Sequence, residues 1–252
     1  MERDFYDRYY ELEDSHWWFR GRRRIITQEA RRLLGPGAGE HGGAELLDVG
    51  CGTGTMLQAL GALGHARGTE MESAAVEFCR RRGLTEVQVA GTPPLPFADA
   101  SLDLITILDV LEHVEDDAGL AADLRRMLRP GGHVIATVPA FPLLWGRQDD
   151  ISHHKRRYVP ATLRAALEGG GLRIERMSYF NTLLFPPIAA VRLFRRVRPA
   201  KGELTSDFEM TSEGPLNDML SRVFAAEARW LRRRDLPVGV SLLAVASAAT
   251  GA

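Results

Sequence analysis

The sequence predicts a single α/β domain, a mostly parallel sheet of seven strands with helices on both faces. Short apolar runs alternate with helix-like stretches from residue 45 to residue 180, as in a parallel sheet with crossover helices. A glycine-rich turn directly follows the first of these runs, which is typical of a ligand site in such a sheet. The length of 252 residues and an apolar content of 45% suit one domain with a substantial core.

The first predicted strand, residues 45–49, leads into a turn with glycine at every second position. Glycine adopts backbone conformations that side chains forbid and lets a ligand approach the main chain. The helix predicted next points its amide-rich end toward that ligand. The D-x-G-x-G-x-G pattern is tighter than the dinucleotide turn G-x-G-x-x-G, which argues against a nicotinamide dehydrogenase. The residues of the pattern are Asp48, Gly50, Gly52 and Gly54.

A second acidic residue, Glu70, ends the strand predicted over residues 65–70. It lies about 20 residues beyond the glycine turn, where a carboxylate holds the hydroxyls of a ribose in nucleotide-binding sheets. Met71 follows it and is suited to cover one face of an adenine ring. The alternative is that Glu70 is an ordinary surface acid at the start of the helix predicted over residues 73–82. Its position favours the ligand-binding role.

Two further motifs complete a family pattern. Asp109-Val110-Leu111-Glu112-His113-Val114 follows the fourth predicted strand, and Leu128-Arg129-Pro130-Gly131-Gly132 precedes the fifth. With the glycine turn, they resemble the class I S-adenosylmethionine (SAM) dependent methyltransferases, in particular the bacterial type 11 group that acts on small molecules. The resemblance covers residues 16–180 and the last strand. It implies a Rossmann-like sheet with an antiparallel last strand, SAM as cofactor, and methyl transfer to an O, N or C atom.

The resemblance also implies which residues bind the cofactor. They are Asp48, Gly50, Cys51, Gly52, Gly54, Glu70, Met71, Thr92, Leu108 and Asp109.

The predicted adenine loop departs from the family pattern. Related enzymes usually place an acid after the glycine that corresponds to Gly91, but here the residue is Thr92. Pro93 and Pro94 follow and have no N–H to offer. This departure keeps a second class open, a SAM-fold binding subunit or partner protein without methyl transfer.

Three histidines are candidates for a catalytic base. His113 follows the fourth strand, and His153 and His154 lie on the polar loop after the fifth, so both places overlook the ligand edge of the sheet. Histidine takes up a proton near neutral pH without much tuning. Adjacent histidines point in different directions, so we expect at most one of the pair to act. The alternatives are that His113 only orients its loop and that the polar loop is a solvated basic connection.

We predict no metal site, because adjacent histidines point apart and no cysteine or further histidine has the spacing of a zinc ligand.

The single domain, residues 1–252, divides into four parts. Residues 1–40, rich in aromatics and arginine, form a helical cap that either packs on the domain or closes over the cofactor with an arginine near its carboxylate. Residues 41–180 form the SAM-binding core, and residues 238–252 form the last strand and a tail. Residues 181–237 are a helical insertion with a basic amphipathic run at 191–198. We favour a lid over the substrate for this run; weak contact with a membrane surface is the alternative.

Composition excludes several other classes of protein. The formal net charge is −1 and the arginine clusters are separated, so nucleic acid is disfavoured as a partner. No signal peptide or apolar run of roughly 18 residues is present, so no transmembrane segment is predicted. Two cysteines make no disulfide framework, which favours the cytoplasm. The expected partner is a small-molecule substrate, and no oligomeric state is predicted.

Overall fold

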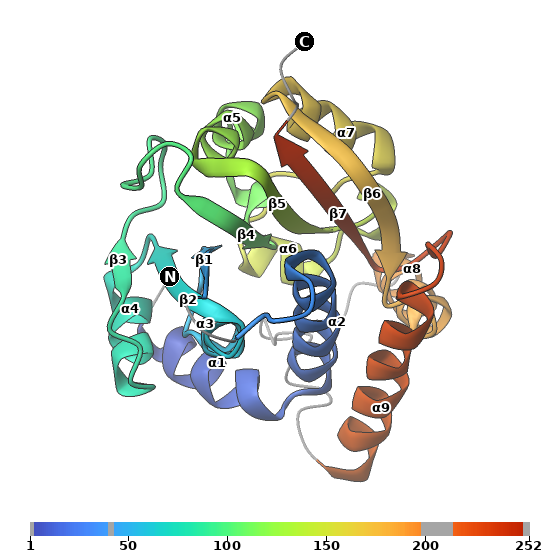
Figure 1. Cartoon of the computed structure of the whole chain (residues 1–252). Helices are drawn as coiled ribbons and strands as arrows, with labels where there is room; N and C mark the ends of the chain where they lie inside the picture. The colour runs from blue at the N-terminus through green and yellow to red at the C-terminus, as the bar shows by residue number, and fades with distance from the viewer. Residues whose placement is uncertain (1–2, 40–42, 198–213, 249–252) are drawn as a thin grey trace.

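The computed structural model describes residues 3–39, 43–197 and 214–248, and within them it forms one seven-stranded sheet (Figure 1). The first five strands are mutually parallel where they pair, and the last strand is antiparallel to both of its neighbours. The predicted fold class is therefore confirmed. The strand order is β3 (Val87–Val89), β2 (Gly64–Glu70), β1 (Ala44–Val49), β4 (Leu102–Leu108), β5 (Leu128–Pro139), β7 (Ser241–Ala248) and β6 (Leu172–Phe180).

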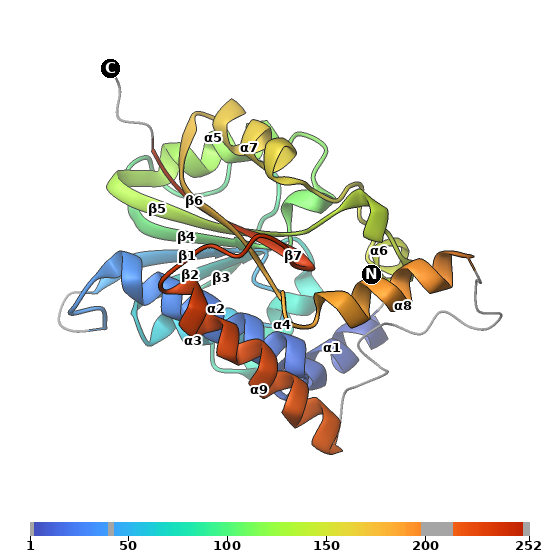
Figure 2. The same ribbon diagram turned by 90° about the vertical axis from the view of Figure 1, so that its right-hand side faces the viewer.

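Helices connect the strands and cover the sheet on both faces (Figure 2). The α-helices are α1 (Arg3–Ser15), α2 (Trp17–Leu34), α3 (Thr55–Gly61), α4 (Ser73–Arg81), α5 (Asp117–Met127), α6 (Arg147–Ile151), α7 (Pro160–Gly169), α8 (Phe185–Val197) and α9 (Gly214–Leu231). Two short 3₁₀ helices are η1 (Leu111–His113) and η2 (Pro142–Leu144).

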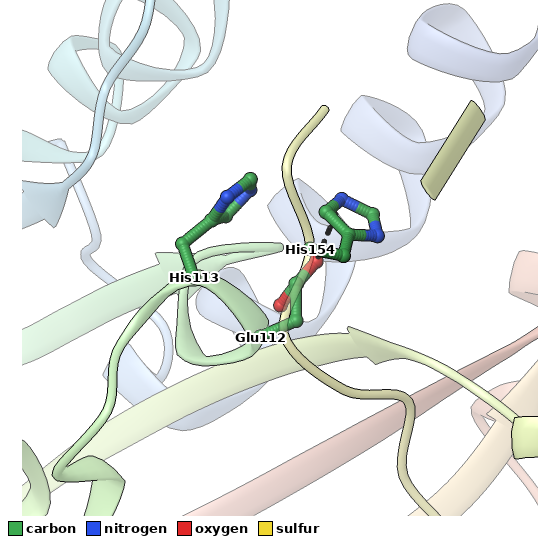
Figure 3. A group of neighbouring side chains, drawn as sticks. All are labelled: Glu112, His113 and His154. Carbon is green, nitrogen blue, oxygen red and sulfur yellow. Dashed lines mark ion pairs between the residues drawn. The ribbon is translucent and has the colours of Figure 1, made fainter. Parts of the chain in front are cut away.

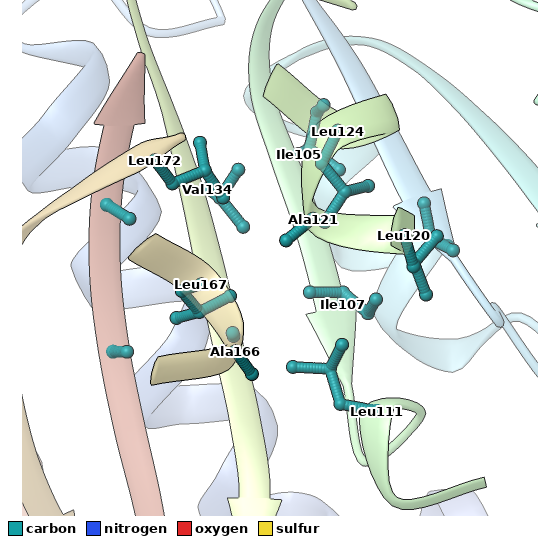
Figure 4. Close-up of a cluster of buried hydrophobic side chains, with 14 of the residues drawn as sticks. Ile105, Ile107, Leu111, Leu120, Ala121, Leu124, Val134, Ala166, Leu167 and Leu172 are labelled. Carbon is teal, nitrogen blue, oxygen red and sulfur yellow. The ribbon is translucent and has the colours of Figure 1, made fainter. Parts of the chain in front are cut away.

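Each face of the sheet has its own apolar core. On one face α5 and α7 pack on the central strands, and Figure 4 shows Leu124 of α5 and Leu167 of α7 among the side chains of β4 and β5. On the other face α2, α3 and α9 pack on the same strands, with Ile26 and Phe224 fully buried. Because both faces are covered, the strands are apolar on both sides, which explains the uninterrupted apolar runs of the sequence.

The N-terminal segment breaks into two helices at His16. The ring of His16 is buried and accepts a hydrogen bond from the Trp18 N–H at 3.2 Å, which caps α2. Asn217 of α9 spans the break, accepting from the Trp17 N–H at 2.7 Å and donating to the Ser15 carbonyl at 3.0 Å. The start of the chain is thus joined to the predicted insertion.

The contact between α2 and α9 requires a glycine at its centre. A Cβ atom on Gly21 would lie only 2.2 Å from the Phe224 ring, so the two helices approach closely only because Gly21 has no side chain. The predicted cap is therefore more than a cover, since α2 is one layer of the core.

Two stretches differ from the expected elements. The fifth strand, predicted to follow Leu128-Arg129-Pro130-Gly131-Gly132, already pairs from Leu128 onward, and Arg129-Pro130-Gly131-Gly132 lies in a register shift between the Leu102 and Leu104 pairs. The polar stretch after β5, predicted as a loop, contains η2 and α6. Five residues of α6 are too few for a helical period to be visible in the sequence.

The predicted insertion contributes α8 and α9. Residues 198–213 of the predicted insertion, including the last residue of the basic run 191–198, lie outside the described residues. Among the residues that are described, no helix combines the length and the apolar content that crossing a membrane requires.

Candidate functional site

A cavity of about 1160 Å³ opens at the carboxyl ends of β1, β2 and β4. This is the edge at which ligands bind in open α/β sheets. It exceeds the roughly 300–1,000 Å³ typical of a pocket for one small molecule, so it has room for a cofactor and a second molecule. Eleven of the thirteen predicted site residues line it; Gly54 and His153 do not. Those that do are Asp48, Gly50, Cys51, Gly52, Glu70, Met71, Thr92, Leu108, Asp109, His113 and His154.

The three glycines of the turn have different roles. Gly50, Gly52 and Gly54 all have positive φ, at 70°, 57° and 96°. A Cβ on Gly50 would lie 2.4 Å from Val110, on the loop after β4. A Cβ on Gly54 would lie 2.6 Å from Leu84 and 3.1 Å from the Cys79 sulfur. Gly54 therefore serves the packing of the turn against α4 and the residues after it.

Glu70 ends β2 and closes the glycine turn from the other side. Its carboxylate accepts the N–H of Gly52 at 3.0 Å, of Met71 at 2.7 Å and of Glu72 at 3.1 Å. These bonds fix the carboxylate at the cavity wall, where the predicted ribose contact would form. Met71 beside it is 63% exposed and can cover a planar ring.

We expect Glu70→Ala to lower SAM affinity at least tenfold, because charge-assisted bonds worth about 1.5–3 kcal/mol each are lost. Calorimetric titration measures this, and the exposed Glu77→Ala variant is the control. Three backbone N–H groups also lose their acceptor in this variant, so the melting temperature of the apo protein should fall as well. Unchanged SAM affinity would mean that Glu70 does not hold the ribose.

The predicted adenine end has few fixed polar groups. Thr92 and Pro93 line the cavity and are exposed. Gly91 lies against Met71, and a Cβ there would be 2.8 Å from the Met71 Cβ. The Thr92 hydroxyl both donates and accepts, so it can meet an adenine amino group without a carboxylate.

The floor of the cavity holds Asp48, which is 2% exposed. Its carboxyl accepts from the Thr106 hydroxyl at 2.6 Å. Burial raises the pKa of Asp48 to about 7, although the Thr106 bond opposes this. Asp48 thus changes charge near neutral pH.

Arg22 of α2 also lies in the cavity wall. Its guanidinium donates to the Asp109 carboxylate and lies 4.4 Å over the Trp18 ring. Asp109 itself follows β4 with a positive φ of 56°. Among the N-terminal arginines whose side chains the structure describes, Arg22 is the one in the cavity wall, so it is the candidate for the arginine expected near the methionyl carboxylate.

Two of the three predicted histidines meet in the cavity. The rings of His113 and His154 are 4.7 Å apart at an interplanar angle of 84°. Figure 3 shows His113 and Glu112 on η1, with His154 on the neighbouring loop. His153 is exposed and does not line the cavity, so the expectation that at most one of the adjacent pair acts now selects His154.

Asp149, which the sequence did not single out, orients His154. The fully buried carboxylate accepts from His154 Nδ1 at 2.9 Å, Arg157 Nε at 2.7 Å and the Gly146 N–H at 2.8 Å. Burial alone would raise the pKa of Asp149, but the bonds from His154 and Arg157 hold it at about 2. With Nδ1 donating to Asp149, the lone pair of His154 lies on Nε2.

Glu112 completes this group. It is 0% exposed, and within the described residues neither carboxylate oxygen has a hydrogen-bond partner. Its Oε1 lies 3.9 Å from His154 Nε2. Burial, and then the charge of Asp109, raise the pKa of Glu112 well above its ordinary value. Burial likewise lowers the pKa of His113 to about 4.

The predicted insertion forms another wall of the cavity. Helix α8 and the residue before it contribute Leu184, Pro187, Ile188, Val191, Arg192 and Arg195. Arg192 donates to the Leu144 carbonyl at 2.9 Å and so ties α8 to η2.

The fold and the arrangement of this edge are those of a class I SAM-dependent methyltransferase. A family model described as a methyltransferase domain matches residues 47–136. A Mycolicibacterium smegmatis protein named a probable S-adenosylmethionine-dependent methyltransferase is 27% identical over 168 residues, 65% of this chain and 62% of that protein. A ubiquinone biosynthesis O-methyltransferase of Methylococcus capsulatus is 34% identical over 99 residues, 36% of this chain and 42% of that protein.

A solved structure shows the fold over nearly the whole chain. A chain from the complex of the Haloferax volcanii Trm112 methyltransferase activator matches with a TM-score of 0.59 and 20% identity, covering 99% of this chain and 98% of that one. The comparisons therefore support the predicted class, a class I SAM-dependent methyltransferase, with the family match over residues 47–136 of this chain. It spans less than two thirds of the length of either curated relative.

Proposed function

We propose that this protein transfers a methyl group from SAM to a small molecule. The observation that carries the proposal is one continuous cavity that runs from the glycine turn and Glu70 to His113 and His154. SAM would lie along the turn with its ribose at Glu70 and its adenine between Met71 and Thr92. Its carboxylate would meet Arg22.

The remainder of the cavity would hold the methyl acceptor. Its walls there are mainly apolar and include Leu184, Ile188, Val191 and Leu220 from α8, α9 and the segment before α8. Such walls exclude water and position an acceptor for in-line attack on the sulfonium methyl, which supplies most of the catalysis in a reaction with so good a leaving group. A wall of this kind suits a small molecule better than a nucleic acid backbone.

The nucleophile would be activated where His113 and His154 meet. An acceptor hydroxyl or ammonium group must lose its proton, and the Nε2 lone pair of His154 is available for this role. Asp149 stabilises the orientation of the ring.

A second candidate function is a SAM-fold subunit that acts through a protein partner. Two observations favour it: Thr92 replaces the usual acid at the adenine edge, and one similar solved chain comes from a complex with a methyltransferase activator.

Calorimetry with SAM and S-adenosylhomocysteine tests cofactor binding directly, and a protein that binds neither is not a methyltransferase. Methyl transfer is tested by incubating the chain with methyl-labelled SAM and a cell extract separated into small-molecule and macromolecular fractions. We expect label in the small-molecule fraction. Label only in the macromolecular fraction would overturn the substrate class, and SAM binding without any transfer would support the second candidate.

A further inference from the structure

We propose that Glu112, His113 and His154 bind a divalent transition-metal ion, and that this ion holds the oxygen nucleophile of the substrate. The inference deepens the proposed function, because the three residues line the same cavity. One ligand atom from each lies within 4.8 Å of the other two. Two imidazoles and one carboxylate around an open side are a recurrent ligand set for Fe²⁺, Zn²⁺ and similar ions.

The strongest single observation is the environment of Glu112. A fully buried carboxyl group without a hydrogen bond is costly, and proteins normally pair such a group or place it on a metal. His154 Nε2 lies 3.9 Å from Glu112 Oε1, which is too far for a hydrogen bond. An ion between them would satisfy both atoms at once.

Both imidazoles are prepared to act as ligands. His154 donates Nδ1–H to Asp149, and this arrangement of carboxylate, histidine and metal fixes the ring and leaves Nε2 for the ion. The His113 ring lines the same cavity, and its centre lies 4.7 Å from that of His154, so a nitrogen of each ring can reach one ion.

The two loops that carry the ligands are joined to each other. The Lys155 N–H, next to His154, donates to the carbonyl of Glu112 at 2.8 Å. The Tyr158 hydroxyl also links the two segments. It lies 3.1 Å from the Leu111 carbonyl oxygen and 2.8 Å from an Asp117 carboxylate oxygen, either of which can accept its proton. The backbone thus holds the ligand positions together, and only side-chain rotation is needed to close around an ion.

The distances allow that closure. Ligand bonds to zinc are about 2.0–2.2 Å long, so two donors on one ion lie no more than about 4.2 Å apart. The Glu112–His154 pair already meets this limit at 3.9 Å. Nitrogen donors favour a transition metal over Mg²⁺ or Ca²⁺, which take oxygen ligands.

The proposed site differs from the sequence-based prediction of no metal. That prediction considered the adjacent pair His153 and His154, which indeed diverge, since only His154 lines the cavity. The second imidazole comes instead from His113, 41 residues earlier in the chain, and the fold brings the two loops together.

The ion would assist methylation of an oxygen. A hydroxyl on the open side of the ion loses its proton to solvent more easily, because the cation stabilises the oxyanion. The oxyanion then forms a bond to the methyl carbon while the carbon–sulfur bond breaks. That electron pair stays on sulfur, so the products are the methyl ether or ester and S-adenosylhomocysteine.

The test is a calorimetric titration of the full chain, freed of metal with a chelator, with Zn²⁺ and separately with Mg²⁺. We expect one equivalent of Zn²⁺ to bind and Mg²⁺ to bind at least tenfold more weakly. Glu112→Gln, His113→Ala and His154→Ala should each weaken Zn²⁺ binding at least tenfold. Asp149→Asn should weaken it by about 10–100-fold, as expected for a residue that orients a ligand.

Two control variants locate the ion. His153→Ala removes the adjacent histidine and should leave Zn²⁺ affinity unchanged. His65→Ala removes the exposed imidazole between Glu45 and Glu86, the competing surface site, and should also leave it unchanged. The proposal would be overturned if the parent chain bound no Zn²⁺, or if Glu112→Gln and His154→Ala bound Zn²⁺ as tightly as the parent. It would also be overturned if His65→Ala lost Zn²⁺ binding.

Folding and cofactor binding are measured on the same samples. Glu112→Gln retains the side-chain volume and replaces a buried carboxyl group that has no hydrogen bond among the described residues, so it should fold, and circular dichroism checks this. SAM is titrated into the metal-free and the Zn²⁺-loaded chain. SAM binding without Zn²⁺ binding overturns the metal site alone, whereas Zn²⁺ binding without SAM binding overturns the proposed function alone.

Discussion

Replacing His154 with alanine should lower kcat by about 10²–10⁴ while SAM affinity is retained. His154 lines the cavity and lies beside His113 and Glu112, whereas Glu70 and the glycine turn would hold the cofactor. The acceptor would therefore keep its proton in the variant, whereas SAM would bind as before. The measurement is steady-state methyl transfer to the acceptor found in the labelled extract, with calorimetry of SAM on the same variant.

The matched control for this prediction is the neighbouring histidine. His153 is exposed and does not line the cavity, so His153→Ala should retain the parent kcat. If both His113→Ala and His154→Ala kept full activity, the alignment of the acceptor with the sulfonium methyl would be the sole source of catalysis.

The same experiment separates a base from a metal ligand. If His154 acts as a base alone, the parent chain stays active after the chelator has removed all metal. If it holds an ion, the chelated parent and His154→Ala should show similar losses, and Zn²⁺ should restore only the parent.

The parts of the site that the sequence predicted are those built from local pattern. The glycine turn, the acid at the end of β2 and the histidine after β4 each follow a strand directly, and parallel strands bring their carboxyl ends to one edge. The residues are therefore identified by their place after an apolar run. Eleven of the thirteen predicted site residues reach the cavity for this reason.

The interactions that the sequence did not predict join distant segments. Arg22 meets Asp109 across 87 positions, and His113 meets His154 through loops that belong to different strands. No periodicity of the chain encodes such a pairing, since it depends on the packing of α2 on the sheet and on the path of the loop after β5.

Asp149 is an instructive exception, because it lies only five residues before His154. The sequence contains the acid and the histidine, but their pairing requires the short turn of α6, which has no recognisable period. Gly54 is the converse case. It belongs to the family pattern, and the structure explains it by the Cys79 and Leu84 side chains that occupy the space a Cβ would need.

The second large effect is expected in folding stability rather than in catalysis. Burial holds the pKa of Asp48 at about 7 in the folded chain, against about 3.9 for a carboxyl group in an unfolded one. Between these two pKa values the folded state binds more protons than the unfolded state. The free energy of unfolding contributed by Asp48 therefore falls as pH rises from about 4 to about 7, and it is constant above that.

The substitution Asp48→Asn should remove this pH-dependent loss in the free energy of unfolding. Asparagine has the shape of the protonated carboxyl, accepts the Thr106 hydroxyl hydrogen bond in the same place and cannot ionise. The variant should resemble the parent at pH 4 and exceed it by up to about 4 kcal/mol at pH 8, which is a difference of about three between the pKa values at 1.36 kcal/mol each. Urea unfolding of the ligand-free chain between pH 4 and pH 8 measures this, with Asp218→Asn on the surface of α9 as the control. A constant difference between variant and parent across that range would show that Asp48 is ionised throughout in the folded protein.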